Sequence, residues 1–132
     1  MAETFADAGS IEGYHAHVYY DPATRPVAER IRQALGAQFT VQLGRWHDAP
    51  VGPHPSSMYQ VAFAADEFAS VVPWLMLNRG GLSVLVHPRT GDDYEDHDRF
   101  RLWLGTPLPL RLEVLSRRGA AAPQSAPAAG PQ

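Results

Sequence analysis

One short segment constrains the fold of this chain more than any other. Residues 80–98 read GGLSVLVHPRTGDDYEDHD. After the two glycines, Leu82, Val84 and Val86 fall on one side of the chain, and they alternate with Ser83, Leu85 and His87. Alternation with a period of two is typical of a strand that buries one face, and Pro88 ends such a strand. The segment therefore predicts a strand over residues 82–87 that presents His87 at its end, followed by an acidic loop that carries His97.

The same alternation recurs in four other segments. Three of them contain no proline and are rich in residues that favour strands: residues 12–20, 39–45 and 57–63. The fourth, residues 108–115, follows Pro107 and contains Pro109. Because proline cannot donate to a strand ladder, this segment predicts a strand at the edge of a sheet.

Two other segments predict helices. Apolar residues recur at every fourth position from Val27 to Leu35, which forms one stripe on a helix, and Gly36 suits its end. The second helix is expected to begin near Asp66, to contain Pro73 and to stop before the two glycines of residues 80–98.

The predicted order of strand, helix, strand, strand, helix and strand is the ferredoxin-like pattern. It predicts an α+β fold in which two helices cover one face of an antiparallel sheet, with an extra C-terminal edge strand. A chain of 132 residues suits one domain, which we place at residues 12–116. Residues 1–11 are expected to form a flexible N-terminus. Residues 117–132, rich in alanine and proline, are expected to form a disordered tail.

Alternation also assigns side chains to the two faces of this sheet. The face beneath the helices receives the valines of the four main strands, which are Val18, Val41, Val61 and Val84. The opposite face receives His15, His17 and His87, so it is neither fully apolar nor fully charged. We expect such a face to be covered, either by the second subunit of a homodimer or by the loop of residues 46–55.

The usual strand order brings most of the histidines together. We expect residues 12–20 to lie between residues 57–63, running parallel to them, and residues 82–87. This arrangement gathers His15, His17, His54, His87 and His97 at one end of the sheet. Three imidazoles, or two with a carboxylate, suit Fe(II) or Zn. The carboxylates that could replace a histidine are those of Glu12, Asp92, Asp93, Glu95 and Asp96.

Composition excludes several classes of function. The chain contains neither cysteine nor lysine, so thiolate metal sites, a cysteine nucleophile and a Schiff-base lysine are excluded. A net charge of −3 gives no basic surface for nucleic acid or for an anionic membrane. No apolar run approaches the roughly 20 residues of a membrane helix, and no signal peptide is visible. We therefore expect a cytoplasmic protein.

One arginine is a candidate for substrate binding. Arg79 follows the second predicted helix and could bind a carboxylate of a substrate through paired hydrogen bonds. The alternative is an interaction with the carbonyl groups at the C-terminus of that helix.

Four stretches together carry a family resemblance. The stretches YHAHVYYD, GPHPSSMYQVAF, LNRGGLSVLVHPRTGDD and DHDRFRLWLG resemble the DOPA 4,5-dioxygenase family over residues 13–112. The resemblance implies a ferredoxin-like fold and the extradiol cleavage of a catechol such as L-DOPA by O₂ at non-haem Fe(II). It further implies that His17, His54 and His87 bind the metal and that His97 is an acid/base catalyst or a substitute ligand. The family pattern often lacks a histidine at the position of His15, so His15 is not counted as a ligand.

Two other classes of function fit the same sequence pattern. A metal-free small-molecule-binding protein, or a cofactor-independent monooxygenase, could use the same dimeric fold with an apolar pocket. It predicts no stoichiometric metal and no effect of the substitution His87→Ala. A structural or regulatory domain that binds a partner protein predicts histidines spread over the surface rather than a buried cluster.

Overall fold

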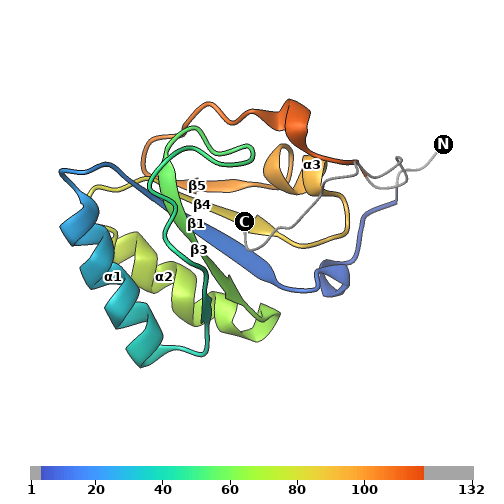
Figure 1. Ribbon diagram of the computed structural model, residues 1–132. Coiled ribbons are helices and arrows are strands. Elements are labelled where there is room, and N and C mark those ends of the chain that lie inside the picture. The colour runs from blue at the N-terminus through green and yellow to red at the C-terminus, as the bar shows by residue number, and fades with distance from the viewer. Residues whose placement is uncertain (1–3, 118–132) are drawn as a thin grey trace.

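The computed structural model describes residues 4–117, and a five-stranded sheet forms its centre (Figure 1). The sheet has the order β2-β3-β1-β4-β5, and α1 and α2 cover one of its faces. In chain order the elements are β1 (Tyr14–Tyr20), α1 (Arg25–Gln38), β2 (Gln42–Leu43), β3 (Ser57–Phe63), α2 (Phe68–Asn78), β4 (Val84–Pro88), α3 (Asp93–His97) and β5 (Leu102–Leu104). Single 3-10 turns lie at Ala8–Ser10, Ala65–Glu67 and Leu112–Val114.

This arrangement confirms the ferredoxin-like α+β fold but corrects the direction of one strand. Every pair of neighbouring strands is antiparallel, and β1 pairs with β3 so that Tyr20 faces Ser57. The predicted parallel orientation of these two strands is wrong. A helical crossover leaves β1 and β2 pointing the same way, and the following connection then reverses the chain, so β3 must oppose β1.

The extra edge strand exists, but it lies earlier in the chain than predicted. Leu102–Leu104 forms β5 and pairs with β4, whereas residues 108–115 form no strand. The prolines that favoured an edge position there allow the segment to leave the sheet altogether. Leu108 and Leu110 instead pack onto the sheet face opposite α1 and α2.

Other predicted boundaries shift by a few residues, except that β3 has the predicted limits. Of the predicted strand 39–45, only Gln42–Leu43 is a strand, and Gly44 adds one backbone hydrogen bond to the Gln60 carbonyl at 2.7 Å. The first helix continues through Gly36 to Gln38, and the second contains Pro73 as expected. The predicted tail, residues 117–132, lies outside the described part of the chain except for its first residue, Arg117.

The core occupies the space between the sheet and the two long helices. Val18, Val61 and Val84 are fully buried there against Leu35 and Leu75, as the alternation predicted. Burial of apolar side chains of this size is the main stabilising contribution to such a layer. None of the helices in residues 4–117 is long and apolar enough to cross a membrane.

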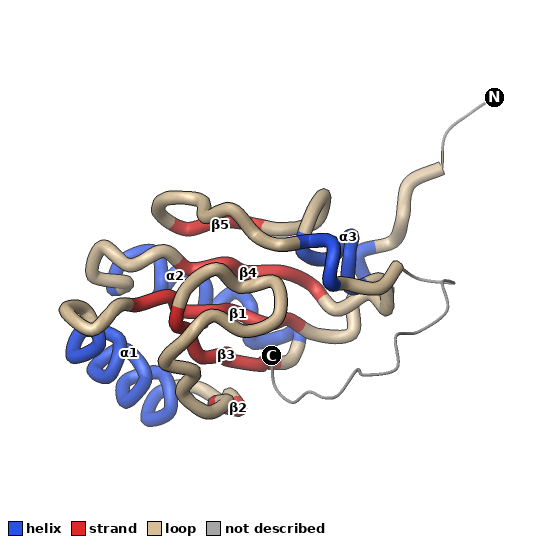
Figure 2. The backbone as a smooth tube through the Cα atoms, turned by 45° about the horizontal axis from the view of Figure 1, so that its top comes forward, coloured by secondary structure: helices blue, strands red, loops and turns tan. Residues whose placement is uncertain are grey.

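The opposite face of the sheet is covered by the chain itself, which was one of the two predicted alternatives. Figure 2 shows the loop between β2 and β3 and the segment after β5 crossing this face. A small second core forms beneath them around Tyr19, Met58 and Leu85. Val51 of the loop and Leu110 of the C-terminal segment pack against it.

Candidate metal centre

Two neighbouring strands place three histidines on the covered face of the sheet. His15 and His17 are two residues apart in β1, so their side chains point to the same face. His87 of β4 lies directly opposite His15 in the strand pairing. His17 and His87 are buried, whereas His15 is partly exposed.

His54 reaches the same place through the long loop rather than through a shared sheet end. Because β3 opposes β1, the start of β3 lies at the far end of β1, and the loop must fold back over the face. A bridge between Val51 and His54 and a bond from the Arg111 amide to the Pro53 carbonyl, 2.8 Å long, fix this fold. His54 is completely buried as a result.

Four residues tie the beginning of this loop to α1. The guanidinium of Arg25 lies 3.9 Å from the ring centre of Trp46 and bonds to Asp48 at 3.0 Å. The Tyr20 hydroxyl donates to the same carboxylate at 2.7 Å. These two donors hold the pKa of Asp48 below its usual value, so the carboxylate stays charged and keeps both bonds.

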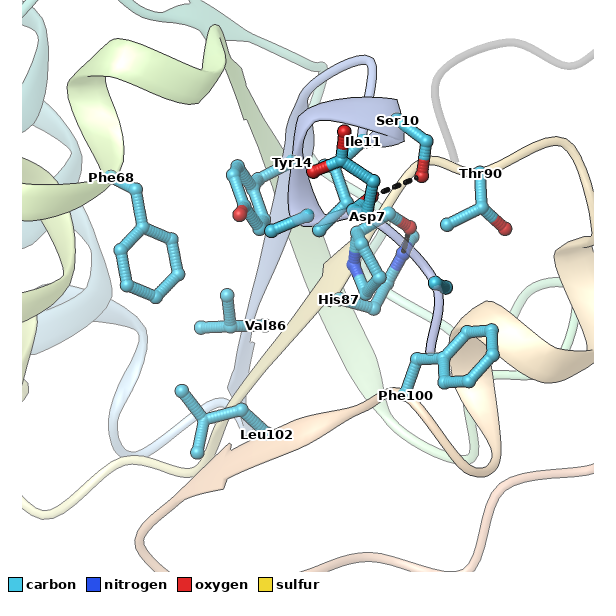
Figure 3. Close-up of a pocket in the computed structure, with 13 residues that line it drawn as sticks. Asp7, Ser10, Ile11, Tyr14, Phe68, Val86, His87, Thr90, Phe100 and Leu102 are labelled. Atoms are coloured by element: carbon cyan, nitrogen blue, oxygen red, sulfur yellow. Dashed lines mark hydrogen bonds between the residues drawn. The ribbon is translucent and has the colours of Figure 1, made fainter. Parts of the chain in front are cut away.

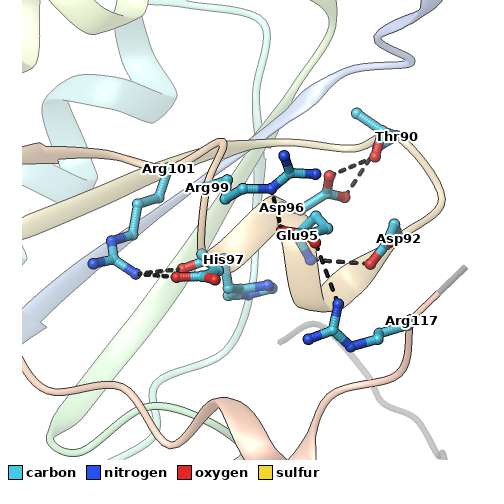
Figure 4. A network of polar contacts seen from close by, with 9 residues as sticks. Thr90, Asp92, Glu95, Asp96, His97, Arg99, Arg101 and Arg117 are labelled. Carbon is cyan, nitrogen blue, oxygen red and sulfur yellow. Dashed lines mark hydrogen bonds and ion pairs between the residues drawn. The ribbon is translucent and has the colours of Figure 1, made fainter.

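His97 enters the site from α3, which is held in place by its own polar contacts (Figure 4). The Asp92 carboxylate caps the helix by accepting from the Glu95 amide at 3.0 Å. Thr90 donates to the buried Asp96 from both its amide and its hydroxyl, at 3.0 and 2.6 Å. The acidic run that follows β4 therefore serves mainly to build the short helix that positions His97.

The four buried histidine rings form one cluster. Ring centres lie 4.2 Å apart for His17 and His54, 4.0 Å for His87 and His97, and 5.1 Å for His17 and His87. Two sets of three have ligand atoms within 4.8 Å of one another, and they share His17. One set is His17, His54 and His97, and the other is His15, His17 and His87. The set predicted from the sequence, His17, His54 and His87, takes members from both.

Hydrogen bonds decide which nitrogen of each ring carries the proton. Nδ1 of His87 lies 2.9 Å from the Pro88 carbonyl and Nδ1 of His97 lies 2.8 Å from the Asp93 carbonyl, so both nitrogens are donors. Nε2 of His87 is then an acceptor, and Nε2 of His17, 3.1 Å away, donates to it. This leaves Nδ1 of His17 and Nε2 of His97 with free lone pairs.

Two buried nitrogens of the cluster have no hydrogen-bond partner among the described residues. They are Nδ1 of His17 and Nε2 of His54. Leaving a buried polar atom unpaired costs about 1–3 kcal/mol, so such atoms call for an explanation. A metal ion bound by these two nitrogens would satisfy both of them, and His97 is the third residue of the candidate set that contains His17 and His54.

The electrostatics of the cluster favour neutral imidazole. Burial lowers the pKa of His54 to about 3 and that of His15 to about 4. Burial and neighbouring histidines hold the pKa of His17 and of His87 well below 6.5, and burial also lowers the pKa of His97. Neutral imidazole is the form that binds metal, so the rings are ready to act as ligands at neutral pH.

Three of the five carboxylates that could have replaced a histidine are engaged elsewhere. Asp92 caps α3, Thr90 holds Asp96, and Glu95 pairs with Arg99 and Arg117 at 2.9 and 3.3 Å. Within residues 4–117, both sets with metal-binding geometry contain histidines only. The donor set is therefore purely imidazole, which suits transition metals rather than Ca²⁺ or Mg²⁺.

Arg79 lies apart from the cluster. Its guanidinium donates to the Leu82 carbonyl at 3.1 Å, two residues before the start of β4, whereas His87 lies near the end of that strand. Five residues of extended chain span about 16 Å. We therefore do not include Arg79 in the site proposed below.

Sequence reasoning assigned no function to Tyr19, whose hydroxyl lies 2.7 Å from Nδ1 of His54. The signal was present, because Tyr19 follows His17 by two residues and so shares its face of the sheet.

Comparison with known proteins agrees with this geometry. Residues 14–114 match the sequence profile of the Dopa 4,5-dioxygenase family. The chain is 37% identical over 114 residues to a DOPA 4,5-dioxygenase of Amanita muscaria, a match covering 80% of this chain and 50% of that enzyme. It is 33% identical over 126 residues to an uncharacterized 21.2 kDa protein of Botryotinia fuckeliana, covering 84% of this chain and 67% of that protein.

A solved structure extends the comparison to the fold. A crystal structure from Nostoc punctiforme PCC 73102, described as a candidate dioxygenase, is 59% identical to this chain with a TM-score of 0.83. The match covers 83% of this chain and 96% of the other. Together with the profile match over most of the described residues, this shows that the chain belongs to the Dopa 4,5-dioxygenase family.

Proposed function

We propose that the protein is a non-haem Fe(II) extradiol dioxygenase that cleaves the ring of a catechol, such as L-DOPA, with O₂. The observation that supports this most directly is a buried cluster made only of histidines, in which two nitrogens have no hydrogen-bond partner within residues 4–117. The family of the chain supports the same reaction class. The cluster also disfavours the metal-free alternative, for which unpaired buried nitrogens would be a pure loss of stability.

His17, His54 and His97 are the ligands that we propose. They form the set whose three members are all buried, and the two ring nitrogens without a hydrogen-bond partner among the described residues belong to two of its members, His17 and His54. Compared with the sequence prediction, His97 and His87 exchange roles. His87 then accepts the Nε2 proton of His17 and orients that ring, as partners of metal-bound histidines commonly do.

His87 is also the residue that we assign to proton transfer. Nε2 is the one ring nitrogen with a lone pair, because Nδ1 already donates to the Pro88 carbonyl, and it can take a proton only when the hydrogen bond from His17 gives way. A catechol must lose a proton before cleavage, and a positioned imidazole can take that proton and return it later. When bound, Fe(II) would hold the catechol oxygens and O₂ next to each other, which removes much of the entropic barrier.

The test is anaerobic loading with Fe(II), followed by exposure of a panel of catechols to air. A yellow ring-cleavage product is expected from at least one of them. His97→Gln should lose the metal, whereas His87→Gln should keep it and lose turnover. No product from any catechol at confirmed iron occupancy would refute the function. Loss of metal in His87→Gln but not in His97→Gln would restore the roles expected from the sequence.

A homodimer and a cytoplasmic location stay predictions. Light scattering on the purified protein tests the dimer directly, because a mass near 14.5 kDa would contradict it.

A further inference from the structure

Gln60 of β3 lies directly opposite His17 in the pairing of β3 with β1. Side chains that face each other in an antiparallel pair share one face of the sheet, and their Cβ atoms are about 4.5–5.5 Å apart. The carboxamide of Gln60 therefore lies on the covered face, next to a proposed metal ligand. Its two neighbours in β3 on that face, Met58 and Ala62, are apolar.

The side chain of Gln60 is buried without a hydrogen bond at its oxygen. The residue is 7% exposed, and Oε1 has no partner within residues 4–117. The backbone carbonyl of Gln60 is engaged, since it accepts from the Gly44 amide at 2.7 Å. A buried acceptor that is left unpaired destabilises a fold. Oε1 therefore calls for a donor that the described part of the chain does not supply.

Three other buried side chains outside the cluster carry a nitrogen without a partner among the described residues. They are Arg32, His47 and Trp103. Arg32 belongs to α1, and His47 and Trp103 pair with residues of the sheet other than the proposed ligands. Gln60 is thus the one of these residues that a strand pairing sets beside a proposed ligand.

The cavity of about 420 Å³ drawn in Figure 3 is separate from this part of the covered face. Tyr14, Phe68 and Val86 line it, and they belong to or pack against the core beneath the helices. His87 is the one buried histidine that lines it, and none of the three proposed ligands does. A ligand of the metal therefore finds its polar contacts on the covered face rather than in this cavity.

A catechol brings a donor of the kind that Oε1 lacks. Its two hydroxyl groups carry one proton each, and His87 is assigned to take one of them. The second hydroxyl needs an acceptor, and a carboxamide oxygen accepts a hydrogen bond without becoming protonated. Gln60 of β3 and His87 of β4 flank β1 from its two sides, so one acceptor is available on each side of His17.

We propose that Oε1 of Gln60 accepts a hydrogen bond from one hydroxyl of the catechol held at the metal, and so fixes the orientation of the ring. The inference rests on the proposed function, because it takes a catechol as the ligand of the metal. Gln60 then destabilises the ligand-free fold and stabilises the bound state. A glutamine with a purely structural role does not have this combination of effects.

The substitution Gln60→Met tests both effects. Methionine is unbranched like glutamine and lacks a strong acceptor. We expect the metal-free variant to unfold about 3 °C or more above the wild type, because the unpaired atom is gone. We expect the metal-loaded variant to keep the metal affinity of the wild type. It should bind catechol without O₂ about 2- to 12-fold more weakly, which is the range for one hydrogen bond.

Gln42→Met is the matched control for this substitution. Gln42 lies in β2 opposite Ala62 and is exposed, so its carboxamide reaches water. It should leave the unfolding temperature, the metal affinity and the catechol affinity unchanged. Differential scanning fluorimetry measures the first, and calorimetric titration under nitrogen measures the other two.

Two results with Gln60→Met would overturn the role of Gln60 in catechol binding. A lower unfolding temperature would show that Oε1 has a partner in the ligand-free protein, and an unchanged catechol affinity would show that it does not contact the catechol. Weaker metal binding would overturn the role as well, because Oε1 would then be a ligand of the metal.

The outcomes also separate this inference from the proposed function. Cleavage of catechol in air together with any of these contrary results would leave the dioxygenase function standing. The expected loss of catechol affinity without cleavage by the wild type would refute the dioxygenase function and leave the role of Gln60 standing. Absence of catechol binding by the metal-loaded wild type would refute both.

Discussion

The hydroxyl of Tyr19 lies 2.7 Å from Nδ1 of His54, and both side chains are buried. The two residues are separated by 35 positions and meet because the loop after β2 folds back over the sheet. With Nδ1 engaged by the tyrosine, Nε2 of His54 has no partner among the described residues, and His54 forms one candidate set with His17 and His97. Tyr19 therefore sets the orientation of a proposed metal ligand.

Replacing Tyr19 by phenylalanine should weaken metal binding more than it weakens the fold. Loss of such a partner typically lowers metal affinity about 10- to 100-fold, whereas one buried hydrogen bond contributes about 1 kcal/mol to stability. Calorimetric titration with Zn(II) or Fe(II) measures the first, and urea unfolding of the metal-free protein measures the second.

Tyr59→Phe is the matched control for this substitution. Tyr59 is equally buried, and its hydroxyl donates to the Ala28 carbonyl at 2.7 Å, on the helix side of the sheet. It should lose similar stability and keep the metal affinity of the wild type. Equal metal affinity in Tyr19→Phe and the wild type would show that Tyr19 does not position His54.

Metal binding should raise the unfolding temperature. A ligand present at 100 times its dissociation constant stabilises the folded state by about 2.7 kcal/mol, and a chelator should remove this gain. His17→Gln should abolish the gain, because His17 belongs to both candidate sets. His47→Gln should retain it, because His47 lies in the loop outside both sets. Differential scanning fluorimetry with and without metal checks all three proteins, and no shift in the wild type would argue against a metal site.

The metal-free protein should lose stability steeply as pH falls below about 6.5. Five histidines of the cluster region have a lowered pKa in the fold, about 3 for His54 and about 4 for His15. Between those values and 6.5 the unfolded chain binds more protons than the folded one, so protonation favours unfolding. Each such histidine contributes a slope of about 1.4 kcal/mol per pH unit.

Denaturant unfolding at pH 7.5, 6.5, 5.5 and 4.5 measures this slope. Burial raises the pKa of Asp96, which acts in the opposite direction but concerns a single group. Bound metal should shift the fall to lower pH, since protons must displace it from the rings. A free energy of unfolding that is constant between pH 7.5 and 5.5 would mean that the histidines are not buried in neutral form.

Removing the Trp46 ring should displace His54, although the two residues are eight positions apart, because Trp46 anchors the loop that carries His54. The ring packs on the main core and contacts Tyr20, Tyr59 and Arg25, and it anchors the start of the loop that carries His54. Trp46→Ala should cost about 2 kcal/mol, somewhat less than for a fully buried tryptophan, and should also lower metal affinity. Trp74→Ala, a half-buried tryptophan of α2 packed on the same core, should cost stability without changing metal affinity. Equal metal affinity in both variants would show that the anchor does not act on His54.

Much of the fold could be predicted because the core pattern is local. The alternation around Val18, Val61 and Val84 follows directly from the geometry of a strand, and each of these residues is buried where expected. The edge strand was misplaced because Leu102–Leu104 is too short to give a clear alternation. Residues 108–115 alternate for a different reason, since Leu108 and Leu110 pack on the covered face without pairing.

The sequence by itself determined the residue types of the site and the shared face of His15, His17 and His87, because strand periodicity fixes the side on which each side chain lies. Only the tertiary structure decided how His54 joins them and which ring nitrogens remain unpaired. The predicted parallel pairing would have delivered His54 along the sheet, but the antiparallel pairing requires a loop folded over the face. That fold depends on contacts between distant residues, such as Arg25 with Trp46 and Tyr19 with His54, and local sequence patterns do not encode such contacts.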